Sequence, residues 1–588
     1  MSTAAVAAEP HSEGWKLTGG TLAAAALAVC VAQIALAIPA VLNGLFQQDL
    51  GTSASQLTWI SDAFLVPVTL FELSFGVLGD LFGRKRLLLI GAGLVAVGEL
   101  VSVLTPGAGT STSSRVLVLW IGQALSGLGS AAIFPTTLAM IAAGTHTAHE
   151  RGRSIAIFAA ALSTGGFLSP LLGGLIVRLH WGSDPTANWR WAFILVLGLS
   201  AASFVVSLMF AENSSAPQGR SLDWPGQVTI AVALFGLLFA IIQASTVGWG
   251  SAQVIIGFVV AAVFLALFII TERRAVAPLL RLDLFSRRAF AVTALVTVSG
   301  VFAFLGTAYA TSVRLSAIQN FSPLKTSIAF LLLNGLTLLQ VPLTMRILPK
   351  WNPRWMLVIG FGLMTIGDFW LALSAKGAVT YGPIVPGLAL VGFGFAFAVS
   401  SVTAVAVNSV EVRLAGMASA TTSQLRDFGF TLGPAIIGAI ALSRAASTVH
   451  QKIAATPALQ KALAAFYAAP AHVPAAARAQ VAAAVGAVKS GPLGANAVPP
   501  TVGGKPFNPI HFIAFHALDH AYRTGFVVCG GAALLSFVLA GVALGGIRHG
   551  SDPAGPQEPA PRGPLERGAP RRTVAHARAG TGRMGRQG

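Results

Sequence analysis

The sequence predicts an all-α integral membrane protein with fourteen transmembrane helices, and three observations support this fold class. The chain has 588 residues, of which 54% are hydrophobic and only 10% charged, a composition that excludes a soluble globular protein of this length. Apolar stretches of roughly 20 residues, long enough to cross a bilayer core of about 30 Å, recur along it. The loops between them are alternately basic and not basic. Helices are expected because lipid cannot satisfy free backbone groups.

Fourteen stretches have the length and composition of a spanning helix. In chain order they are 20–45, 57–79, 87–105, 116–143, 154–177, 189–210, 226–247, 252–271, 289–313, 326–348, 355–375, 383–410, 416–442 and 521–547. The first is longer than a signal-peptide core and has no obvious cleavage site, so it is expected to remain in the mature protein. Cys30 and Cys529 both fall inside spans, so no disulfide framework is expected.

The distribution of Lys and Arg predicts a multi-pass protein of the plasma membrane with both termini in the cytoplasm. With the N-terminus inside, the six short inner loops carry fifteen basic residues and the six short outer loops carry six. An even number of spans requires the same arrangement of the termini. The outer side then holds the long segment between the last two spans.

The net charge of +18 comes largely from these inner loops and from the tail 548–588. Anionic lipid head groups attract basic loops, so membrane lipids are the expected partner and nucleic acid is not. The tail is rich in Pro and Gly and almost free of large apolar residues, which predicts disorder. Residues 1–19 form a short cytoplasmic segment.

An internal repeat divides the spans into two halves. The pattern Gly127-Leu-Gly129 in the fourth span returns as Gly392-Phe-Gly394 in the twelfth, 265 positions later, and Gly165, Pro170 and Gly174 return 264 positions later. The third and eleventh spans match at an offset of 269. The repeat predicts a six-helix half at 20–210 and a second, parallel half at 289–547. Residues 211–288 are left as an inserted helix pair.

Residues 76–86, GVLGDLFGRKR, resemble the signature of the major facilitator superfamily in the loop between its second and third helices. Residues 165–174, GGFLSPLLGG, are similar to a signature of exporters in that superfamily. The fourteen spans, WISDAF at 59–64 and WRWAF at 189–193 resemble its drug:proton antiporter branch. The resemblance implies the major facilitator fold, with alternating access around a midplane site between two parallel halves.

The loop signature predicts a cytoplasmic latch. Asp80 lies near three cations and can pair with them or with the N-terminus of a neighbouring helix, while glycines permit the tight turn. The alternative is an ordinary basic inner loop. The residues of this latch are Gly76, Asp80, Gly83, Arg84, Lys85 and Arg86.

The fifth span predicts a bendable interface between the halves. Its glycines allow close approach of backbones, and its proline removes one backbone hydrogen bond. The alternative is tight packing without motion. The residues of this hinge are Gly165, Gly166, Pro170, Gly173 and Gly174.

The chain departs from the drug antiporters where charges are expected. The resemblance implies an acid in the first span and an arginine in the fourth, but Cys30 and Gln123 stand there. Proton exchange, if present, must therefore use other acids inside spans, where a charge is costly and is either functional or paired. The candidates are Asp62, Glu72, Glu99, Asp368 and Asp427.

Glu72 and Glu99 are the best placed of these acids by depth. For each acid the alternative is a structural interhelical bond. Arg426 and Gln123 are candidates for substrate contact or gating. Arg426 and Asp427 are adjacent and so about 100° apart around their helix, and need not pair.

Phenylalanines supply most aromatic residues of the second half and predict a cavity suited to hydrophobic, flat or cationic molecules. For most of them the alternative is contact with lipid or with neighbouring helices. The candidates are Phe302, Phe304, Phe393, Phe395 and Phe397, with Phe428 and Phe430 also in the thirteenth span.

The outer segment 443–520 is Ala-rich and predicts a folded cap with helices at 457–469 and 474–489. Pro457 and Pro474 stand near helix starts and Gly491 follows a helix end. A stabilising role is expected. The alternatives are a lid or a docking site for a periplasmic or cell-wall partner.

The sequence therefore predicts a secondary active exporter of small amphipathic organic molecules, such as drugs or toxic compounds, that works in exchange for protons. The alternative within transport is an exporter of lipids or secreted metabolites without clear proton coupling. A non-transporting sensor or scaffold is a third. No metal-binding, nucleotide-binding or nucleophile motif occurs, so an enzyme is not expected, and neither is a cofactor or metal.

Overall fold

The computed structural model describes residues 16–179, 184–215, 222–275, 278–336, 351–374, 380–410, 415–468 and 475–543, with single residues 340, 343, 346 and 377. The described residues all belong to one compact unit within residues 1–547. The predicted tail and most of the N-terminal segment 1–19 lie outside the described residues.

The first half contains the helices from α1 to α7. They are α1 (Gly19–Ala37), η1 (Ile38–Val41), α2 (Asn43–Leu50), α3 (Ala54–Phe82), α4 (Arg84–Val103), α5 (Thr112–Ala143), α6 (Ala148–Ile176), η2 (Pro185–Trp189) and α7 (Arg190–Phe210). The inserted pair is α8 (Trp224–Val247) and α9 (Ala252–Arg274).

The second half begins with η3 and includes the cap that was predicted between its last two spans. Apart from the cap, its elements are η3 (Leu282–Ser286), α10 (Arg288–Ser312), the π-helical turn η4 (Val313–Ile318), α11 (Pro323–Phe330), the π-helical turn η5 (Leu331–Gly335), α13 (Pro353–Ser374), α14 (Tyr381–Asn408), α15 (Ala415–Ala454), α19 (His511–Val538) and the π-helical turn η8 (Leu539–Ala543).

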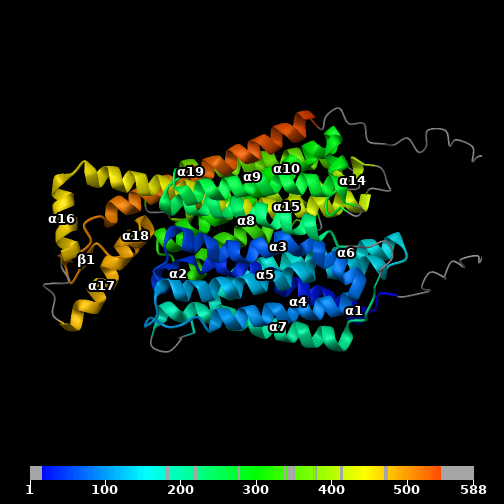
Figure 1. Cartoon of the computed structure of the whole chain (residues 1–588), viewed down its shortest axis with the longest axis horizontal. Coiled ribbons are helices and arrows are strands. Elements are labelled where there is room, and N and C mark those ends of the chain that lie inside the picture. The colour runs from blue at the N-terminus through cyan, green and yellow to red at the C-terminus, as the bar shows by residue number, and fades with distance from the viewer. Residues whose placement is uncertain are drawn as a thin grey trace, which may run out of the picture. The chain divides into compact units, whose positions relative to one another are not determined.

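The all-helical membrane fold is confirmed: among the described residues, thirteen helices are long and apolar enough to cross a membrane. The remaining predicted span, 326–348, starts with α11 and η5, but most of it after Leu336 lies outside the described residues. Figure 1 shows α1 and α3–α7 in its lower part and α10, α14, α15 and α19 in its upper part.

Equivalent helices of the two halves make equivalent contacts. α4 packs against α5 and α7, and α13 packs in the same way against α14 and α19. The repeated glycines are where these backbones approach. A Cβ atom at Gly91 would lie 2.8 Å from the carbonyl oxygen of Gly129, and one at Gly360 would lie 2.6 Å from that of Gly394. The internal repeat in the sequence is therefore a repeat of close helix packing.

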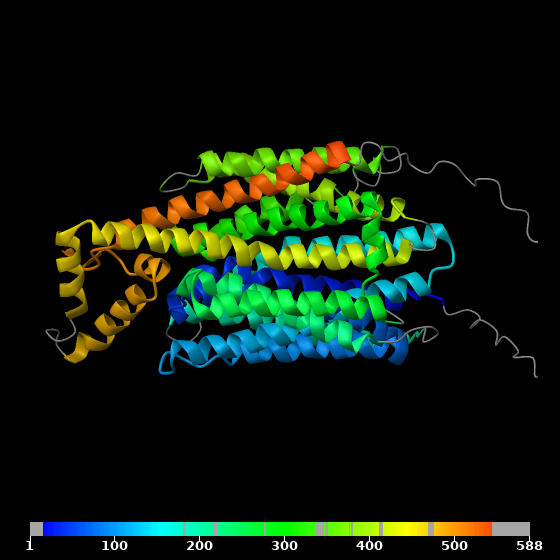
Figure 2. The same ribbon diagram turned by 45° about the horizontal axis from the view of Figure 1, so that its top comes forward.

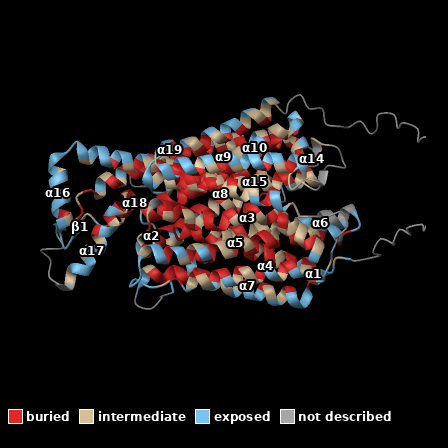
Figure 3. Ribbon diagram, viewed as in Figure 1, coloured by how far each residue is buried: buried red, intermediate tan, exposed pale blue. Residues whose placement is uncertain are grey.

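The halves meet along two seams, α3 against α15 and α6 against α11. The inserted helix α8 packs against both helices of the first seam, where Leu238 and Ile242 are buried with Val66 and Ala435. The inserted pair thus covers one seam. Figure 3 shows buried residues gathered along α3, α8 and α15, which pack against one another.

The cap lies between α15 and α19 and is shorter than predicted, because both helices run on beyond the predicted spans (Figure 2). α15 continues to Ala454 through Ala-rich sequence that favours helix, and α19 begins at His511. The two predicted cap helices occur as α16 (Pro457–Ala468) and α17 (Ala475–Lys489). The prediction missed α18 (Pro492–Ala497) and a hairpin of β1 (Thr501–Val502) and β2 (Lys505–Pro506).

Candidate functional site

A cavity of about 670 Å³ lies between the two halves. α1, α3, α5 and α6 line it from one side, and α10, η5, α14 and α15 line it from the other. Its lining reaches Asp80, Asp223 and Arg281, at the end of the bundle predicted to be cytoplasmic. We call this end of the cavity the inner mouth.

The halves are in contact at the opposite end of the cavity. The Asn43 side chain donates a hydrogen bond of 2.7 Å to the Ser312 hydroxyl, and the hydroxyls of Thr58 and Tyr309 are 2.8 Å apart. A Cβ atom at Gly44 would lie 2.5 Å from the carbonyl oxygen of Ser316, so only glycine allows η4 to approach α2 this closely. The cavity is therefore closed at this end.

A charged cluster of Glu72, Arg426 and Asp427 lines the cavity at the seam between α3 and α15. Glu72 and Asp427 come from different halves and lie within side-chain hydrogen-bonding reach of each other. Arg426 pairs with the adjacent Asp427, with its Nε atom 3.2 Å from Oδ1. Adjacent residues lie about 100° apart around a helix, so their positions in the sequence did not require this pair. Two of the predicted acids and the predicted arginine are thus brought together.

The same seam is held by neutral hydrogen bonds around that cluster. The Thr69 hydroxyl donates to the Asp427 carbonyl oxygen at 3.0 Å and is 2.7 Å from the Thr431 hydroxyl. Gln424 donates to the Thr69 carbonyl oxygen. The cluster is therefore part of a continuous polar contact between halves.

The other three predicted acids are fully buried and do not line the cavity. Asp62 lies near Tyr309, at the closed end of the cavity. Both of its carboxyl oxygens lack a hydrogen-bond partner among the described residues. Glu99 accepts one hydrogen bond, 2.8 Å, from Ser126, and Asp368 accepts one, 2.6 Å, from Thr307. The last two are related by the repeat offset of 269, since each sits at the same place in its own half.

Gln123, at the position where the resemblance implies an arginine, is fully buried between α4 and α5. Its amide donates a hydrogen bond of 3.2 Å to the Ser102 hydroxyl, within the first half. It does not line the cavity.

The cavity separates the predicted phenylalanines into two groups. Phe304 and Phe395 line it as a parallel stack with ring centroids 3.6 Å apart, and Phe430 lies 6.3 Å from Phe395. Phe302, Phe393 and Phe397 do not line it. The cavity is also lined by four aromatic residues that were not predicted from the sequence: Phe134, Phe158, Phe330 and Tyr309. In helices that are apolar on all sides, periodicity does not separate cavity from lipid.

The loop after α3 makes contacts inside the first half. Asp80 and Arg84 form a buried ion pair of 2.7 Å, and the Arg84 backbone N–H donates to the Ser214 carbonyl oxygen at 2.9 Å. Lys85 donates to the Leu208 carbonyl oxygen at 2.9 Å. Gly76 and Asp80 also line the cavity, whereas Gly83 takes the positive φ of 104° at the turn and Arg86 is exposed.

The glycines of α6 contact both halves. A Cβ atom at Gly165 would lie 2.5 Å from the Cys30 carbonyl oxygen of α1, and one at Gly173 would lie 2.9 Å from Ile38. A Cβ atom at Gly174 would lie 2.8 Å from Leu324 of α11. Gly166 lines the cavity, and the Pro170 carbonyl oxygen accepts a hydrogen bond from Ser327 of α11.

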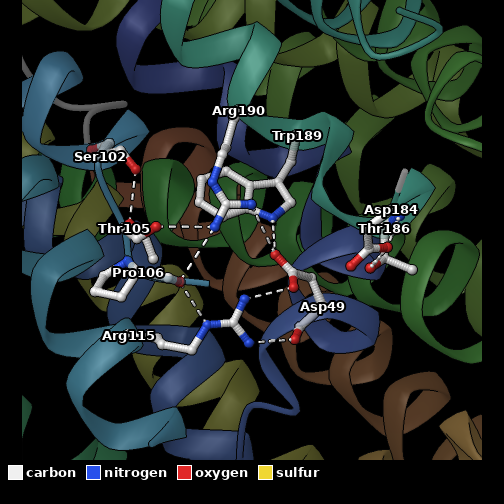
Figure 4. Close-up of polar contacts among 9 residues, drawn as sticks. All are labelled: Asp49, Ser102, Thr105, Pro106, Arg115, Asp184, Thr186, Trp189 and Arg190. Atoms are coloured by element: carbon white, nitrogen blue, oxygen red, sulfur yellow. Dashed lines mark hydrogen bonds and ion pairs between the residues drawn. The ribbon is translucent and has the colours of Figure 1, made fainter. Parts of the chain in front are cut away.

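A buried cluster around Asp49 was missed by the sequence analysis (Figure 4). One carboxylate oxygen lies 2.6 Å from Arg115, and the other accepts hydrogen bonds from Trp189 at 2.7 Å and Arg190 at 3.2 Å. The two arginines also donate to the carbonyl oxygens of Thr105 and Pro106. This cluster joins α2, α5 and α7 at the end of the bundle opposite the inner mouth.

Comparison with known proteins supports the same fold. The sequence profile of the Major Facilitator Superfamily matches residues 23–434. Multidrug resistance protein Stp of Mycobacterium tuberculosis (strain CDC 1551 / Oshkosh) is 30% identical over 69% of this chain and 72% of its own length. The tetracenomycin C resistance and export protein of Streptomyces glaucescens is 26% identical over 74% and 77%.

Among solved structures, a bacterial homologue of the human lysosomal transporter Spinster, in an inward-facing and unoccupied conformation, superposes with a TM-score of 0.58. It is 14% identical, over 89% of this chain and 97% of that chain, so this likeness concerns the fold alone. The profile match covers most of the chain, and the two parallel six-helix halves agree with it. The chain is therefore a multi-pass membrane transporter that belongs to the major facilitator superfamily.

Proposed function

We propose that the protein is a secondary active exporter that moves amphipathic organic molecules out of the cell by alternating access, in exchange for protons. One observation carries this proposal: a cavity that is closed at one end and reaches the inner mouth at the other combines an aromatic wall with a buried carboxyl pair that joins the two halves. The names of the relatives, which include multidrug resistance and tetracenomycin C resistance and export, support export of such molecules.

The aromatic wall suits flat, apolar or cationic substrates. Phe304, Phe395 and Phe430 line the cavity from the second half, and Phe134 and Phe158 line it from the first. Rings of this kind bind aromatic molecules and, through their faces, cations. Gln33 and Asn334 add polar groups that can orient a substrate. The wall therefore favours amphipathic molecules over sugars or small ions.

The pair of Glu72 and Asp427 supplies a site for proton exchange. A hydrogen bond between two carboxyl groups needs one proton, because two carboxylates have no donor between them. When that proton leaves through the inner mouth, two negative charges face each other across the seam, and Arg426 can neutralise only one of them. Because the pair spans both halves, its protonation is linked to their relative position.

We place both termini in the cytoplasm and the cap outside the cell, so that the described conformation is open toward the cytoplasm. The basic inner loops support this orientation. A cysteine placed at Gly486 in the cap should react with an impermeant reagent added to intact cells, and one placed at Ser286 on η3 should not. The reverse pattern would contradict the orientation.

The test of the function is transport in sealed inside-out vesicles, with and without an imposed pH gradient, using a fluorescent lipophilic cation. The unmodified protein should accumulate the cation only with the gradient. Glu72→Gln and Asp427→Asn should each abolish accumulation at matched protein levels, while Glu212→Gln, an exposed acid outside the cavity, should not. Indifference of the unmodified protein to the gradient would contradict proton exchange.

A second candidate function is export of a secreted metabolite. It is favoured by the Streptomyces relative, whose name couples resistance with export of one compound. The same vesicles distinguish the two functions. A narrow metabolite exporter should ignore most lipophilic cations, whereas a multidrug exporter should move several unrelated ones.

A further inference from the structure

Two acids meet at the inner ends of the inserted helices. Asp223 caps the N-terminus of α8, where its Oδ1 accepts a hydrogen bond of 2.8 Å from the Gly226 backbone. Glu272, in the last turn of α9, is only 4% exposed. Its Oε2 accepts a hydrogen bond of 3.2 Å from the Leu280 backbone. Each acid therefore uses one oxygen to hold local backbone.

The second oxygens of the two acids converge. Asp223 Oδ2 and Glu272 Oε1 are buried and have no hydrogen-bond partner among the described residues. A Cβ atom at Gly226 would lie 2.8 Å from Glu272 Oε1 and would also strike Asp223 Oδ2, so both oxygens flank this one glycine. Two ionised carboxylates placed in this way repel each other, whereas a proton on one of them removes the repulsion and provides a hydrogen-bond donor.

No cation among the described residues is placed to neutralise the pair. Among the described residues, the charged group that acts on Glu272 is Asp223. Arg273 and Arg274, the neighbouring residues on α9, are exposed. On the packed loop, Arg281 is engaged by Asp283 at 2.7 Å, and from α3 the neighbours of this end of α8 are the neutral Leu70 and Ser74.

The pair sits where segments attached to different halves meet. α8 is tied to α3 of the first half by Gln227, whose amide donates a hydrogen bond of 2.6 Å to the Leu70 carbonyl oxygen. The loop held by Glu272 leads into η3, and Leu284 of η3 is buried against Phe290, Ala406 and Ala418 of the second half. Pro278, Leu279 and Arg281 of this loop line the inner mouth, as does Asp223.

We propose that Asp223 and Glu272 form a proton-binding site at the inner mouth, separate from Glu72 and Asp427, in which one shared proton holds α8, α9 and the loop 278–281 together. When the proton passes to water in the mouth, the two carboxylates repel each other and the loop is released. The consequence for transport rests on the proposed function. The bound proton stabilises the conformation that is open to the cytoplasm, and a rise in cytoplasmic pH favours closure of the inner mouth.

The test measures the distance across this site without substrate or transport. Spin labels are placed at Val228 on α8 and Ser286 on η3, both exposed, in full-length protein carrying Cys30→Ser and Cys529→Ser. The distance is followed by pulsed electron resonance from about pH 5 to about pH 9, a range that includes carboxyl groups with raised pKa values. We expect one short distance at low pH and a longer or broader distribution at high pH.

Glu272→Gln and Asp223→Asn should each remove this pH response and keep the short distance throughout. An amide donates the hydrogen bond that the shared proton supplied, and Asn caps a helix as well as Asp does. Asp283→Asn is the matched control on the same loop. Hydrogen bonds from Arg281 hold the pKa of Asp283 below its usual range, so it stays ionised and its removal should leave the response unchanged.

A distance that does not depend on pH in the unmodified labelled protein would overturn the proposal, and so would a response that survives in both variants. Restoration of the short distance at high pH by NaCl or MgCl₂ would also overturn it, because the site would then bind a metal cation instead of a proton. Loss of transport in vesicles with an intact pH response would contradict the proposed function and leave this site standing.

Discussion

At the end opposite the inner mouth, each half is held by a buried ion pair at a matching position, but with the charges exchanged. In the first half, Asp49 follows the first span and pairs with Arg190 at the start of the sixth. In the second half, Arg314 lies 265 positions after Asp49, and it pairs with Asp519 in the last span. All four side chains are at most 8% exposed. We call each of these two buried ion pairs a clamp. The repeat preserves the position of the clamp and exchanges its acidic and basic residues.

The inversion shows what the fold requires at this point. The first and last helices of each half need a strong contact at the end opposite the inner mouth, and a buried ion pair supplies it with either order of charges. The clamps differ in their further partners. Asp49 also accepts hydrogen bonds from Arg115 and Trp189 (Figure 4), whereas Asp519 accepts one from the backbone N–H of Gly377.

The largest expected effect follows from this difference. Asp49→Asn leaves two buried arginines without their carboxylate, and removing one partner of a buried pair destabilises by about 3–5 kcal/mol. Asp519→Asn leaves one arginine, so its loss should be smaller. Thermal unfolding of the purified variants in detergent measures both. An equal fall in Tm, or a larger one for Asp519→Asn, would contradict the comparison.

The next largest effect tests whether the acidic and basic residues of each clamp can be exchanged. Arg314→Asp and Asp519→Arg should each lower Tm, and the double variant should recover much of the loss because the pair is restored in reverse. The matching double variant of the first half, Asp49→Arg with Arg190→Asp, should not recover the lost Tm, because an arginine at position 49 would face Arg115. Recovery in both halves would mean that Arg115 and Trp189 add little to the first clamp.

The clamps also show why some features could be predicted from the sequence and others could not. Spans follow from apolar length, and the repeat follows from glycines, because close backbone contact needs the same residue in both halves. A letter-by-letter comparison at the correct offset finds Gly129 and Gly394. It does not find Asp49 and Arg314, which occupy matching places with opposite chemistry.

The cavity was only partly predictable for a related reason. Buried charge marked Glu72 and Asp427 as candidates, but their contact joins residues 355 positions apart and depends on how the halves are docked. The same holds for Phe134 and Phe330, since an apolar helix gives no sign of which face meets water. The Asp223 and Glu272 contact depends in addition on Gly226 leaving space for both acids.

A smaller effect should distinguish the aromatic walls of the two halves. Four lining phenylalanines come from the second half and two from the first, and Phe395 alone stacks on Phe304 and lies near Phe430. Phe395→Ala should therefore weaken the apparent affinity for an aromatic cation by roughly fivefold, about 1 kcal/mol. Phe134→Ala should weaken it less. Concentration dependence of vesicle uptake measures both, with Phe302→Ala, outside the cavity, as the control.

The smallest effect is expected for the acids that the repeat relates most closely. Glu99 and Asp368 each accept one hydrogen bond from a hydroxyl of their own half and do not line the cavity. If the halves move as rigid bodies, the surroundings of these two acids stay constant, so their protonation is not linked to the transport cycle.

Glu99→Gln and Asp368→Asn should therefore retain accumulation driven by a pH gradient, although depth alone had favoured Glu99 equally with Glu72. Each amide keeps an oxygen that can accept the hydrogen bond from Ser126 or Thr307. Vesicle uptake at matched protein levels, with Glu72→Gln beside them, makes the measurement. If either variant lost accumulation as completely as Glu72→Gln while keeping its Tm, the proton path would have to run through the interior of a half, and the seam would not be its only site.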